Sequence, residues 1–480
     1  MAIMTPNQYL RSVEDVKPKV YIHGELAQDL YKHPLLQPSL NSMFLTYAVS
    51  HKPEWQATSH LLAGEPISLW THPYFTKEDM IRKVNLERML GRMTGSCFQR
   101  CVGMDMISAM WATTYDVDQA KGTKYHQRFK EWVKEAQRKD WAIAGAMTDV
   151  KGDRGRRPSQ QADPDMFVHV VDKNDKGIIV RGAKAHITGA ALMHELFVIP
   201  TQTMISGEEG YVVAFAVPNN APGVVHFLGR VPSDTRRLEN TLMDTGNIEY
   251  GAGSHETLII FDNVFVPWER VFLCGETDFS LHAVWRFASY HRENGCKAGV
   301  FDTIIGAAAL LAEYNGVDKK SHIQDKISDM LIETEAIYAC SIASATLGSQ
   351  HPSGICLSNP VYTSCMKNLG SKWVYDVVNR AHDISGGILV TMPSEKDLRH
   401  PEVGRYVEKY LKGVAHVDTE DRMKIIRYLE NITMGPMQVE ICVGAGPSQA
   451  ERAVMRHIMP LEEYKGYARK LAQIKSPKDK

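Results

Sequence analysis

The chain has 480 residues, of which 44% are hydrophobic and 23% charged, and its formal net charge is -1. A chain of this length is too long to fold around one small hydrophobic core, so roughly two or three domains or layers are expected. The balanced charge argues against an extended basic surface that would bind nucleic acid or an anionic membrane. Because no run of about 18 uninterrupted apolar residues occurs, we expect no membrane-spanning helix.

The cysteine content indicates a reducing compartment. Eight cysteines are too sparse for a disulfide scaffold in a chain of this length. The first residues, Met1–Pro6, also lack the basic and apolar regions of a secretory signal. We therefore predict a cytoplasmic protein.

Residues 1–141 are predicted to form an N-terminal helical domain. Thr5-Pro6 is a typical helix start. Thr76 precedes Lys-Glu-Asp in a pattern that resembles a capping box, and apolar residues then recur at helical spacing. Residues 125–137 are charged on one face and apolar on the other, which is typical of an amphipathic helix.

Residues 142–272 are predicted to form a β domain. Short β-branched and aromatic runs alternate there with turn residues, as strands and their connections do. The predicted strands are 167–171, 178–181, 196–200, 212–217, 224–227 and 257–261.

Residues 273–480 return to a helical pattern. The predicted helices are 304–314, 323–347, 365–381 and 403–412. The chain thus follows the order helices, strands, helices, which gives an α+β fold. By analogy, this is the acyl-CoA dehydrogenase-like arrangement, with an N-terminal helical domain, a middle β-barrel domain and a C-terminal helical bundle around a flavin.

Two distant motifs carry candidate metal ligands. Cys97-Phe-Gln-Arg-Cys101 would place both sulfurs on one face if it lies on a helix, and His291 and Cys296 form the second pair. Three thiolates and one imidazole are suitable ligands for an iron–sulfur cluster. The spacing alone also fits separate buried cysteines and a structural histidine.

Several motifs together resemble one family. They are Cys97-Phe-Gln-Arg-Cys101, Gly182-Ala-Lys-Ala-His-Ile-Thr188-Gly189, Asp262-Asn-Val-Phe-Val-Pro267-Trp-Glu-Arg270, Tyr290-His291-Arg with Cys296-Lys297, and Ser385-Gly386-Gly387. The chain is similar, over nearly its whole length, to the dehydratase branch of the 4-hydroxyphenylacetate 3-hydroxylase flavoprotein family. The cysteine and histidine set distinguishes that branch from the hydroxylases, which have no cluster.

The resemblance implies a specific activity and its cofactors. It implies radical dehydration of 4-hydroxybutyryl-CoA to crotonyl-CoA and isomerisation of vinylacetyl-CoA, with the acyl-CoA as substrate. It implies FAD and one [4Fe–4S] cluster in each subunit of a homotetramer. On this basis Cys97, Cys101, His291 and Cys296 are the cluster ligands.

The sequence departs from the family pattern between the last two ligands. His291 and Cys296 are five positions apart, closer than in the family, and the tyrosine that the family places between them is absent. Residues five apart do not share a helix face. Asn294-Gly295 would break the helix and re-aim Cys296, and a π-bulge would serve the same purpose. Tyr290 is a candidate replacement for the missing tyrosine.

Four residues are candidates for catalytic roles. His291 combines the role of ligand with that of a base, because histidine transfers protons near neutral pH. Glu256 matches a family glutamate near the substrate, and Glu451 resembles a C-terminal glutamate that enters the site. Lys297 would steer the substrate carbonyl or the flavin charge. Each of these also fits an ordinary structural or solvated side chain.

The flavin is expected to contact two segments. Thr188 and Gly189 supply a hydroxyl and a close backbone approach, as the family's flavin contact does. Met147, Thr148 and Asp149 would line the same pocket. Basic residues and loop amides suit a pyrophosphate, and the nearby polar loop contributes Lys151, Asp153 and Arg154. The alternatives are an ordinary turn and a charged surface connection.

Two other functions stay open from the sequence. A flavin-dependent aromatic hydroxylase would use the same fold without a cluster. A non-catalytic flavin-binding protein would have lost its chemistry at the shortened segment between His291 and Cys296. The sequence indicates neither the CoA-binding residues nor the pathway.

Overall fold

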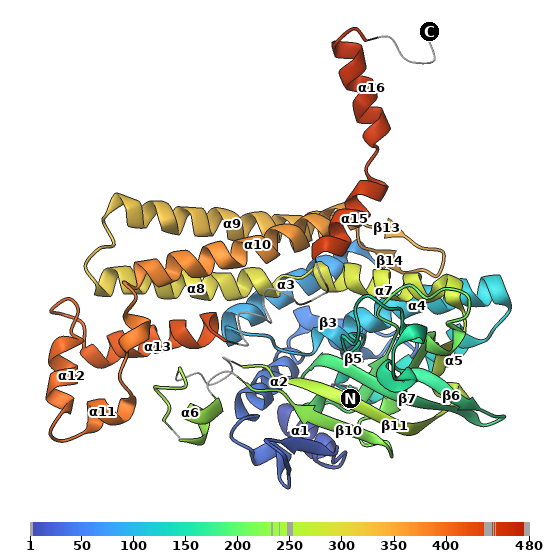
Figure 1. Ribbon diagram of the computed structural model, residues 1–480, viewed down its shortest axis with the longest axis horizontal. Helices are drawn as coiled ribbons and strands as arrows, with labels where there is room; N and C mark the ends of the chain where they lie inside the picture. Colours follow the sequence, from blue (N-terminus) through green and yellow to red (C-terminus); the bar gives the residue numbers. More distant parts are fainter. Residues whose placement is uncertain are drawn as a thin grey trace.

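The computed structural model describes residues 3–231, 234–239, 241–246, 253–435, 444, 446 and 448–474. A long helical layer lies against a strand-rich region, and the N-terminal helices pack beside the strands (Figure 1). The mixed helix-and-sheet class predicted from the sequence is confirmed.

The first region is mainly helical. Its elements are α1 (Pro6–Glu14), β1 (Val20–Ile22), β2 (Glu25–Leu26), α2 (Gln37–Val49), β3 (Gln56–Thr58), β4 (Pro66–Ser68), α3 (Lys77–Thr94), α4 (Cys101–Lys121) and α5 (Tyr125–Lys139). Helix α3 begins at the predicted capping box, in which Thr76 and Asp79 bond each other's backbone N–H groups. Gly95 ends α3 in the left-handed conformation, with φ 60°.

The strands form two main sheets. They are β5 (Ile143–Ala146), β6 (His169–Lys173), β7 (Gly177–Thr188), β8 (Glu195–Val198), β9 (Val213–Pro218), β10 (Val224–Leu228), β11 (Glu256–Pro267) and β12 (Val271–Cys274), with the short helix α6 (Asp234–Leu238) after β10. One sheet has the order β2-β1-β10-β11-β7-β6 and the other has the order β12-β9-β8-β5.

The long antiparallel pair β7 and β11 is the centre of the larger sheet. Its register places Thr188 opposite Glu256 at one end and Gly177 opposite Pro267 at the other. Strands β1 and β2 join this sheet from the N-terminal region, which the sequence did not predict, because β1 pairs in parallel with β10. Among the described strands, the two end strands of each main sheet do not pair with each other. The predicted closed β-barrel is therefore not confirmed.

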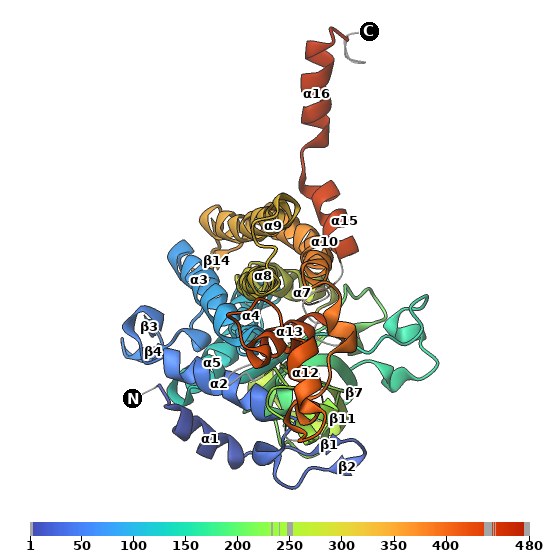
Figure 2. The ribbon, with the colours of Figure 1, turned by 90° about the vertical axis from the view of Figure 1, so that its left-hand side faces the viewer.

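The last region is a set of packed helices. Its elements are α7 (Thr277–Arg292), α8 (Cys296–Tyr314), α9 (Ser321–Thr346), β13 (Ser349–Gln350), β14 (Cys356–Leu357), α10 (Pro360–Ile384), α11 (Glu395–Arg399), α12 (Gly404–Tyr410), α13 (Thr419–Thr433), α15 (Ser448–Ile458) and α16 (Leu461–Leu471). Helices α8, α9 and α10 lie side by side in both views (Figures 1 and 2). Helix α16 projects away from the body in both views.

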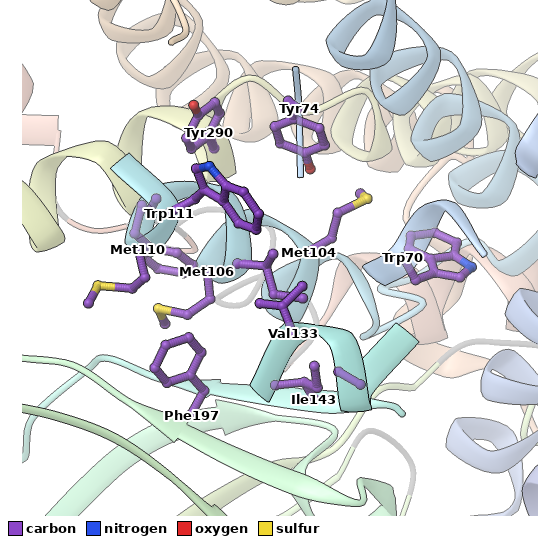
Figure 3. Packing of buried hydrophobic residues seen from close by; sticks show 14 of the residues in the cluster. Trp70, Tyr74, Met104, Met106, Met110, Trp111, Val133, Ile143, Phe197 and Tyr290 are labelled. Carbon is purple, nitrogen blue, oxygen red and sulfur yellow. The ribbon is translucent and has the colours of Figure 1, made fainter. Parts of the chain in front are cut away.

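The main core lies where α4 packs against α5, α7 and the smaller sheet. Helix α4 contributes Met104, Met106 and Met110 to a cluster that also holds Trp111 and Phe197 (Figure 3). Because methionine is unbranched and adaptable, it fills the irregular space between these aromatic rings. Most of α4 is therefore buried and is fixed in position relative to the strands.

One stretch of the described chain has the length and apolar character of a membrane-spanning helix. It is Thr277–Tyr314, with a mean hydropathy of 1.4 in its most apolar window. Of that window, 67% is buried inside the protein, and the stretch contains the two core helices α7 and α8. The apolar side chains of this stretch therefore pack inside the protein, as those of core helices do.

Candidate active site at the junction of helices and sheet

The two cysteines of the first motif lie on a loop and at a helix start. Helix α3 ends at Thr94, and Cys101 is the first residue of α4. Cys97 lies in the intervening loop, where Gln99 has a φ of 72°. The two cysteines therefore do not share one continuous helix, and the condition under which both sulfurs would lie on one helix face is not met. Gly95 terminates α3, and the left-handed backbone at Gln99 is incompatible with a helix at that position.

Hydrogen bonds hold this cysteine loop in place. The Gln99 side chain is fully buried, and its Nε2 donates to the Ser39 carbonyl at 3.1 Å. Ser39 Oγ donates back to Gln99 Oε1 at 2.9 Å. Because a left-handed non-glycine residue is strained, these bonds must stabilise it. They fix the loop that carries Cys97.

The second motif breaks between α7 and α8. Helix α7 ends at Arg292 and α8 begins at Cys296, so the prediction that Asn294-Gly295 interrupts the helix is confirmed. Asn294 Nδ2 donates to the His291 carbonyl at 2.6 Å. The backbone of α8 then comes against α3, since a Cβ on Gly295 would lie 2.0 Å from the Val84 carbonyl oxygen.

Two further glycines continue this close contact of α3 with α8. A Cβ on Gly91 would lie 2.5 Å from the Cys296 carbonyl oxygen, and one on Gly299 would lie 2.2 Å from the Arg88 carbonyl oxygen. Side chains cannot occupy such spaces, so the two helix backbones touch directly. The contact brings the start of α8 to the end of α3, where the cysteine loop begins.

The three cysteines lie near one another in this region. A hydrogen bond of the Cys101 thiol to Cys97, burial, and the neighbouring Cys97, Glu87 and Cys296 groups raise the pKa of Cys101. Burial, with Glu87 and Cys97 nearby, likewise raises the pKa of Cys296. Each shift arises because a thiolate would lie in an apolar, negatively charged space. Lys297 and Lys83 oppose the shift at Cys296, and a positively charged iron–sulfur core would favour its thiolate further, so the donor set suits such a core.

The same donors are not arranged to hold a single metal ion. In the described part of the chain, no three histidine, cysteine or carboxylate side chains are arranged around one point. A [4Fe–4S] cluster holds its ligands at separate iron corners, so its ligands need not converge on one atom. The described residues therefore form no ready-made site for a single metal ion.

His291, on α7, contacts α4 one helical turn beyond Cys101. Its Nδ1 is 2.9 Å from Oδ2 of Asp105, and Asp105 is four positions after Cys101. The imidazole stacks on Phe287, with ring centroids 5.5 Å apart. The side chain of His291 is 20% exposed, whereas that of Asp105 is fully buried. A histidine at this position has both a fixed orientation and access to the site.

Sequence analysis missed the polar residues behind His291. Lys83 on α3 is fully buried and lies 2.9 Å from Asp105 Oδ1 and 3.8 Å from Glu87 Oε1. Burial alone would lower the pKa of Lys83, but Asp105, Glu87 and Glu293 together raise it. The sequence signal that could have revealed them is Lys83 itself, a charged residue on the otherwise apolar face of a helix. A buried charge at such a position requires a partner of opposite charge.

Two carboxylates near Lys83 are also fully buried. Burial raises the pKa of Glu87 to about 8, although Lys83 opposes the shift. Burial raises the pKa of Glu293 to about 7, and Ser344 Oγ donates to its Oε2 at 2.7 Å. Glu293 lies in the shortened segment between His291 and Cys296. This segment therefore introduces a buried acid directly beside two candidate ligands.

The structure brings two predicted residues of the sheet together. Thr188 Oγ1 donates to Glu256 Oε1 at 2.6 Å, across the end of the β7–β11 pair. The following residue, Gly189, has a φ of 71°, and a Cβ there would lie 2.8 Å from Gln99 Cβ. The predicted flavin turn thus contacts the loop that carries Cys97.

The other predicted flavin segment lies along the same strand. Lys184 of β7 is buried, and its Nζ donates to Asp149 Oδ1 at 2.5 Å and to the Met147 carbonyl at 2.8 Å. The Ala185 N–H donates to the Thr148 carbonyl at 2.8 Å. Lys151, Asp153 and Arg154 continue into an exposed loop. The structure therefore ties the first three residues to β7 and leaves the charged three at the surface.

Glu451 and Lys297 lie near the helix junction. Glu451 is buried, forms an ion pair with Arg292, and accepts from Ser364 Oγ at 2.6 Å. Arg292 is the residue after His291, so α15 is attached directly beside the second motif. Lys297 is 7% exposed in the first turn of α8, next to Cys296. Both side chains are therefore held inside the protein near the candidate site.

Comparison with known proteins places this architecture in a class of flavoprotein fold. The oxygenase component of 4-hydroxyphenylacetate 3-monooxygenase, in a crystal structure with FAD, has a TM-score of 0.85 over 98% of both chains, at 24% identity. Residues 5–273 match the family's N-terminal region and residues 281–473 match its C-terminal region. The chain belongs to the 4-hydroxyphenylacetate 3-hydroxylase family.

More similar relatives lie in one branch of that family. The 4-hydroxybutyryl-CoA dehydratase/vinylacetyl-CoA-Δ-isomerase of Clostridium aminobutyricum is 40% identical, over 98% of this chain and 100% of its own. An oxygen-tolerant archaeal 4-hydroxybutyryl-CoA dehydratase from N. maritimus has a TM-score of 0.96 at 41% identity, over 99% and 96% of the two chains. The resemblance to the dehydratase branch that the motifs indicated is confirmed.

Proposed function

We propose that the protein dehydrates 4-hydroxybutyryl-CoA to crotonyl-CoA and isomerises vinylacetyl-CoA to the same product. The observation that carries the proposal is that Cys97, Cys101 and Cys296 lie near one another, while Asp105, one helical turn after Cys101, holds His291. A hydroxylase of this fold has no evident use for three neighbouring thiols, of which Cys101 is buried and the other two are partly buried. The full-length similarity to dehydratases supports the same conclusion.

We propose a [4Fe–4S] cluster held by Cys97, Cys101, His291 and Cys296, and one FAD beside it. When bound, these groups supply one-electron chemistry and a Lewis acid, which no side chain provides. The protein fixes the ligands by main-chain contacts, through the close approach of α8 to α3 at Gly295. It also keeps Cys101 in a buried position, which excludes water from that ligand.

His291 and Glu256 are the proposed proton-transfer residues. With Nδ1 occupied by Asp105, His291 presents Nε2 as its remaining nitrogen for binding or proton transfer. Glu256 receives a hydrogen bond from Thr188, which holds the carboxylate at the end of β11. The two groups come from different elements, so each can serve a different proton of the substrate.

The flavin-binding residues are proposed from the two segments on β7. Thr188 and Gly189 would contact the ring system at the turn that touches Gln99. Met147, Thr148 and Asp149 would line the pocket further along the strand, where Lys184 fixes them. The exposed Lys151 and Arg154, with Asp153, lie in a loop whose position suits the charged pyrophosphate end.

Lys297 and Glu451 complete the proposed site. Lys297 lies beside Cys296 and would supply positive charge to the substrate carbonyl or to the flavin. Glu451 binds Arg292, so it would fix the residue adjoining His291. Both roles depend on α15 and α10 covering the helix junction.

We further propose that the protein is a cytoplasmic homotetramer. None of the seven described cysteines forms a disulfide, which suits a reducing compartment. Helix α16 projects from the body (Figure 1). It carries an exposed apolar stripe that a second copy would cover. The stripe consists of Leu461, Tyr464, Tyr467 and Leu471, exposed by 57%, 43%, 56% and 86%.

The test is the cofactor content and activity of protein purified without exposure to air. We expect about four iron and about four sulfide per chain, one FAD, and formation of crotonyl-CoA from 4-hydroxybutyryl-CoA. Flavin without iron, together with hydroxylation of 4-hydroxyphenylacetate by reduced flavin and oxygen, would instead establish the hydroxylase function. Flavin with neither activity would indicate a non-catalytic flavin-binding protein.

A further inference from the structure

The imidazole of His291 is held on two sides. Its Nδ1 is 2.9 Å from Asp105 Oδ2, and its ring is nearly parallel to that of Phe287, with an interplanar angle of 10°. The carboxylate fixes one edge of the ring and the aromatic face limits its rotation. The ring therefore has a defined orientation before any substrate arrives.

Asp105 is itself fixed by two donors on its other oxygen. The Tyr74 hydroxyl donates to Oδ1 at 2.8 Å, and Lys83 Nζ lies 2.9 Å from the same atom. The side chains of Asp105 and Lys83 are both fully buried. Because both donors use Oδ1, the second oxygen, Oδ2, faces His291.

Lys83 also holds the backbone that carries the histidine. Its Nζ donates to the carbonyl of Tyr290, the residue immediately before His291. One buried ammonium therefore binds both the main chain beside His291 and the carboxylate that binds its ring. The position of the imidazole relative to α3 and α4 is fixed at two points.

This arrangement determines which nitrogen of His291 is available. A carboxylate that receives bonds from Lys83 and Tyr74 accepts and does not donate, so Nδ1 of His291 must carry the hydrogen. The lone pair of the neutral ring is then on Nε2. A carboxylate behind a histidine ligand orients the ring and fixes its tautomer in many metal sites.

Given the cluster of the proposed function, on which this inference rests, the geometry points to Asp105 as the positioning residue of His291. Asp105 directs Nε2, and not Nδ1, toward the cluster and the substrate. It touches neither group itself and acts only through the imidazole. Lys83 and Tyr74 support it by holding its Oδ1.

The decisive measurement uses the wild-type holoenzyme. Histidine labelled with ¹⁵N at either Nδ1 or Nε2 is incorporated, the cluster is reduced, and nitrogen hyperfine couplings are recorded by pulsed electron paramagnetic resonance. We expect the strong histidine coupling to change from that of ¹⁴N to that of ¹⁵N only when Nε2 carries the label. A strong Nδ1 coupling, or no strong histidine coupling, in protein with a full complement of iron overturns the inference alone. Protein without iron overturns the proposed function.

Variants test whether Asp105 is responsible. Asp105→Asn is expected to weaken the Nε2 coupling and to lower activity roughly 10- to 100-fold, with flavin content unchanged. If that variant does not fold, Asp105→Glu keeps the charge for Lys83 but displaces the carboxyl group, and the coupling should still change. A wild-type coupling in either folded variant overturns the assignment.

Helix α4 supplies a matched control. Asp116 lies on the same helix and also faces a histidine, with Oδ1 3.2 Å from His351 Nε2. Asp116→Asn removes the same charge from a second Asp–His pair outside the candidate site. We expect its hyperfine spectrum to match that of the wild type. A change equal to that of Asp105→Asn would show a general effect of charge on α4 and would contradict the assignment.

Discussion

Gln99 packs directly against Gly189, so close that a Cβ on Gly189 would lie 2.8 Å from Gln99 Cβ. One residue belongs to the loop of Cys97 and the other to the turn after Thr188. The contact joins the proposed cluster site to the proposed flavin site without an intervening side chain. A hydrogen-bonded chain supports it, since Ser39 Oγ binds both Gln99 and His255 Nδ1, the latter at 2.7 Å.

Gly189→Ala should disrupt this junction. The added methyl group would collide with Gln99 and with Met193 Cε, 2.7 Å away, at a φ of 71°. We expect a loss of about 2–4 kcal/mol in unfolding free energy and a lower flavin content, measured by denaturation and absorbance. The matched control is Gly122→Ala, at a φ of 68° with no atom within 4 Å, which should lose only about 1 kcal/mol and keep its flavin. Equal effects would contradict a role for the contact.

Cys296→Ala should remove the cluster and leave the flavin. The substitution deletes one of the three neighbouring thiols, which lie near Glu87. We expect iron content to fall by most of its value and activity to fall by more than about 100-fold, since even indirect ligand changes cost 10- to 100-fold. Cys340→Ala, at a half-buried thiol on α9, is the control and should change neither. Retention of iron in Cys296→Ala would exclude Cys296 as a ligand.

Glu451→Gln should loosen α15. The substitution leaves Arg292 without this carboxylate in a buried setting, where burial already lowers the pKa of the guanidinium. Breaking a buried pair costs about 3–5 kcal/mol. We expect faster amide hydrogen exchange in 448–458 and a lower thermal midpoint. Glu463→Gln on the exposed helix α16 should change stability by less than about 0.5 kcal/mol. Exchange rates equal to wild type would rule out the ion pair as the anchor of α15.

His255 should make the protein sensitive to acid. Burial lowers the pKa of His255 to about 3, whereas an unfolded chain protonates histidine near 6.5. Below that pH the unfolded state binds a proton that the folded state excludes, so stability falls as pH decreases from about 6.5 toward 3. Between pH 7 and 5 this group alone should account for about 2 kcal/mol.

Urea unfolding at both pH values checks this contribution. His255→Gln should show a weaker loss between pH 7 and 5 than the wild type, by about 2 kcal/mol. His416→Gln, at an exposed histidine, should keep the wild-type pH dependence. An unchanged dependence in His255→Gln would mean that His255 accepts a proton in the folded protein.

The sequence predicted the helices and strands better than the connections between them. The capping box at Thr76 and the break at Asn294-Gly295 are local signals, so residue types alone were enough to locate them. The sequence left open whether Cys97 lies on a helix, because the left-handed backbone at Gln99 depends on distant partners such as Ser39. Strand β1 was missed for the same reason, since its partner β10 is about two hundred positions away.

The candidate site shows the same division. The cysteines and His291 could be chosen as candidates because their chemistry is distinctive in any sequence, and their role as ligands stays a prediction. Asp105 and Lys83 were missed because their function depends on a contact between α3 and α4 that no local pattern encodes. The ion pair of Glu451 with Arg292 likewise depends on two helices distant in the sequence. Long-range partners must therefore come from the structure.

The direct backbone contact of α3 with α8 has an evolutionary consequence. At Gly91, Gly295 and Gly299, any larger side chain would strike the main chain of the other helix. A relative that carries a larger residue at one of these positions must separate the two helices, and the cysteines would no longer meet in this geometry. The three glycines are thus a signature that can be sought in other sequences, alongside the cysteines, to recognise chains that share this junction.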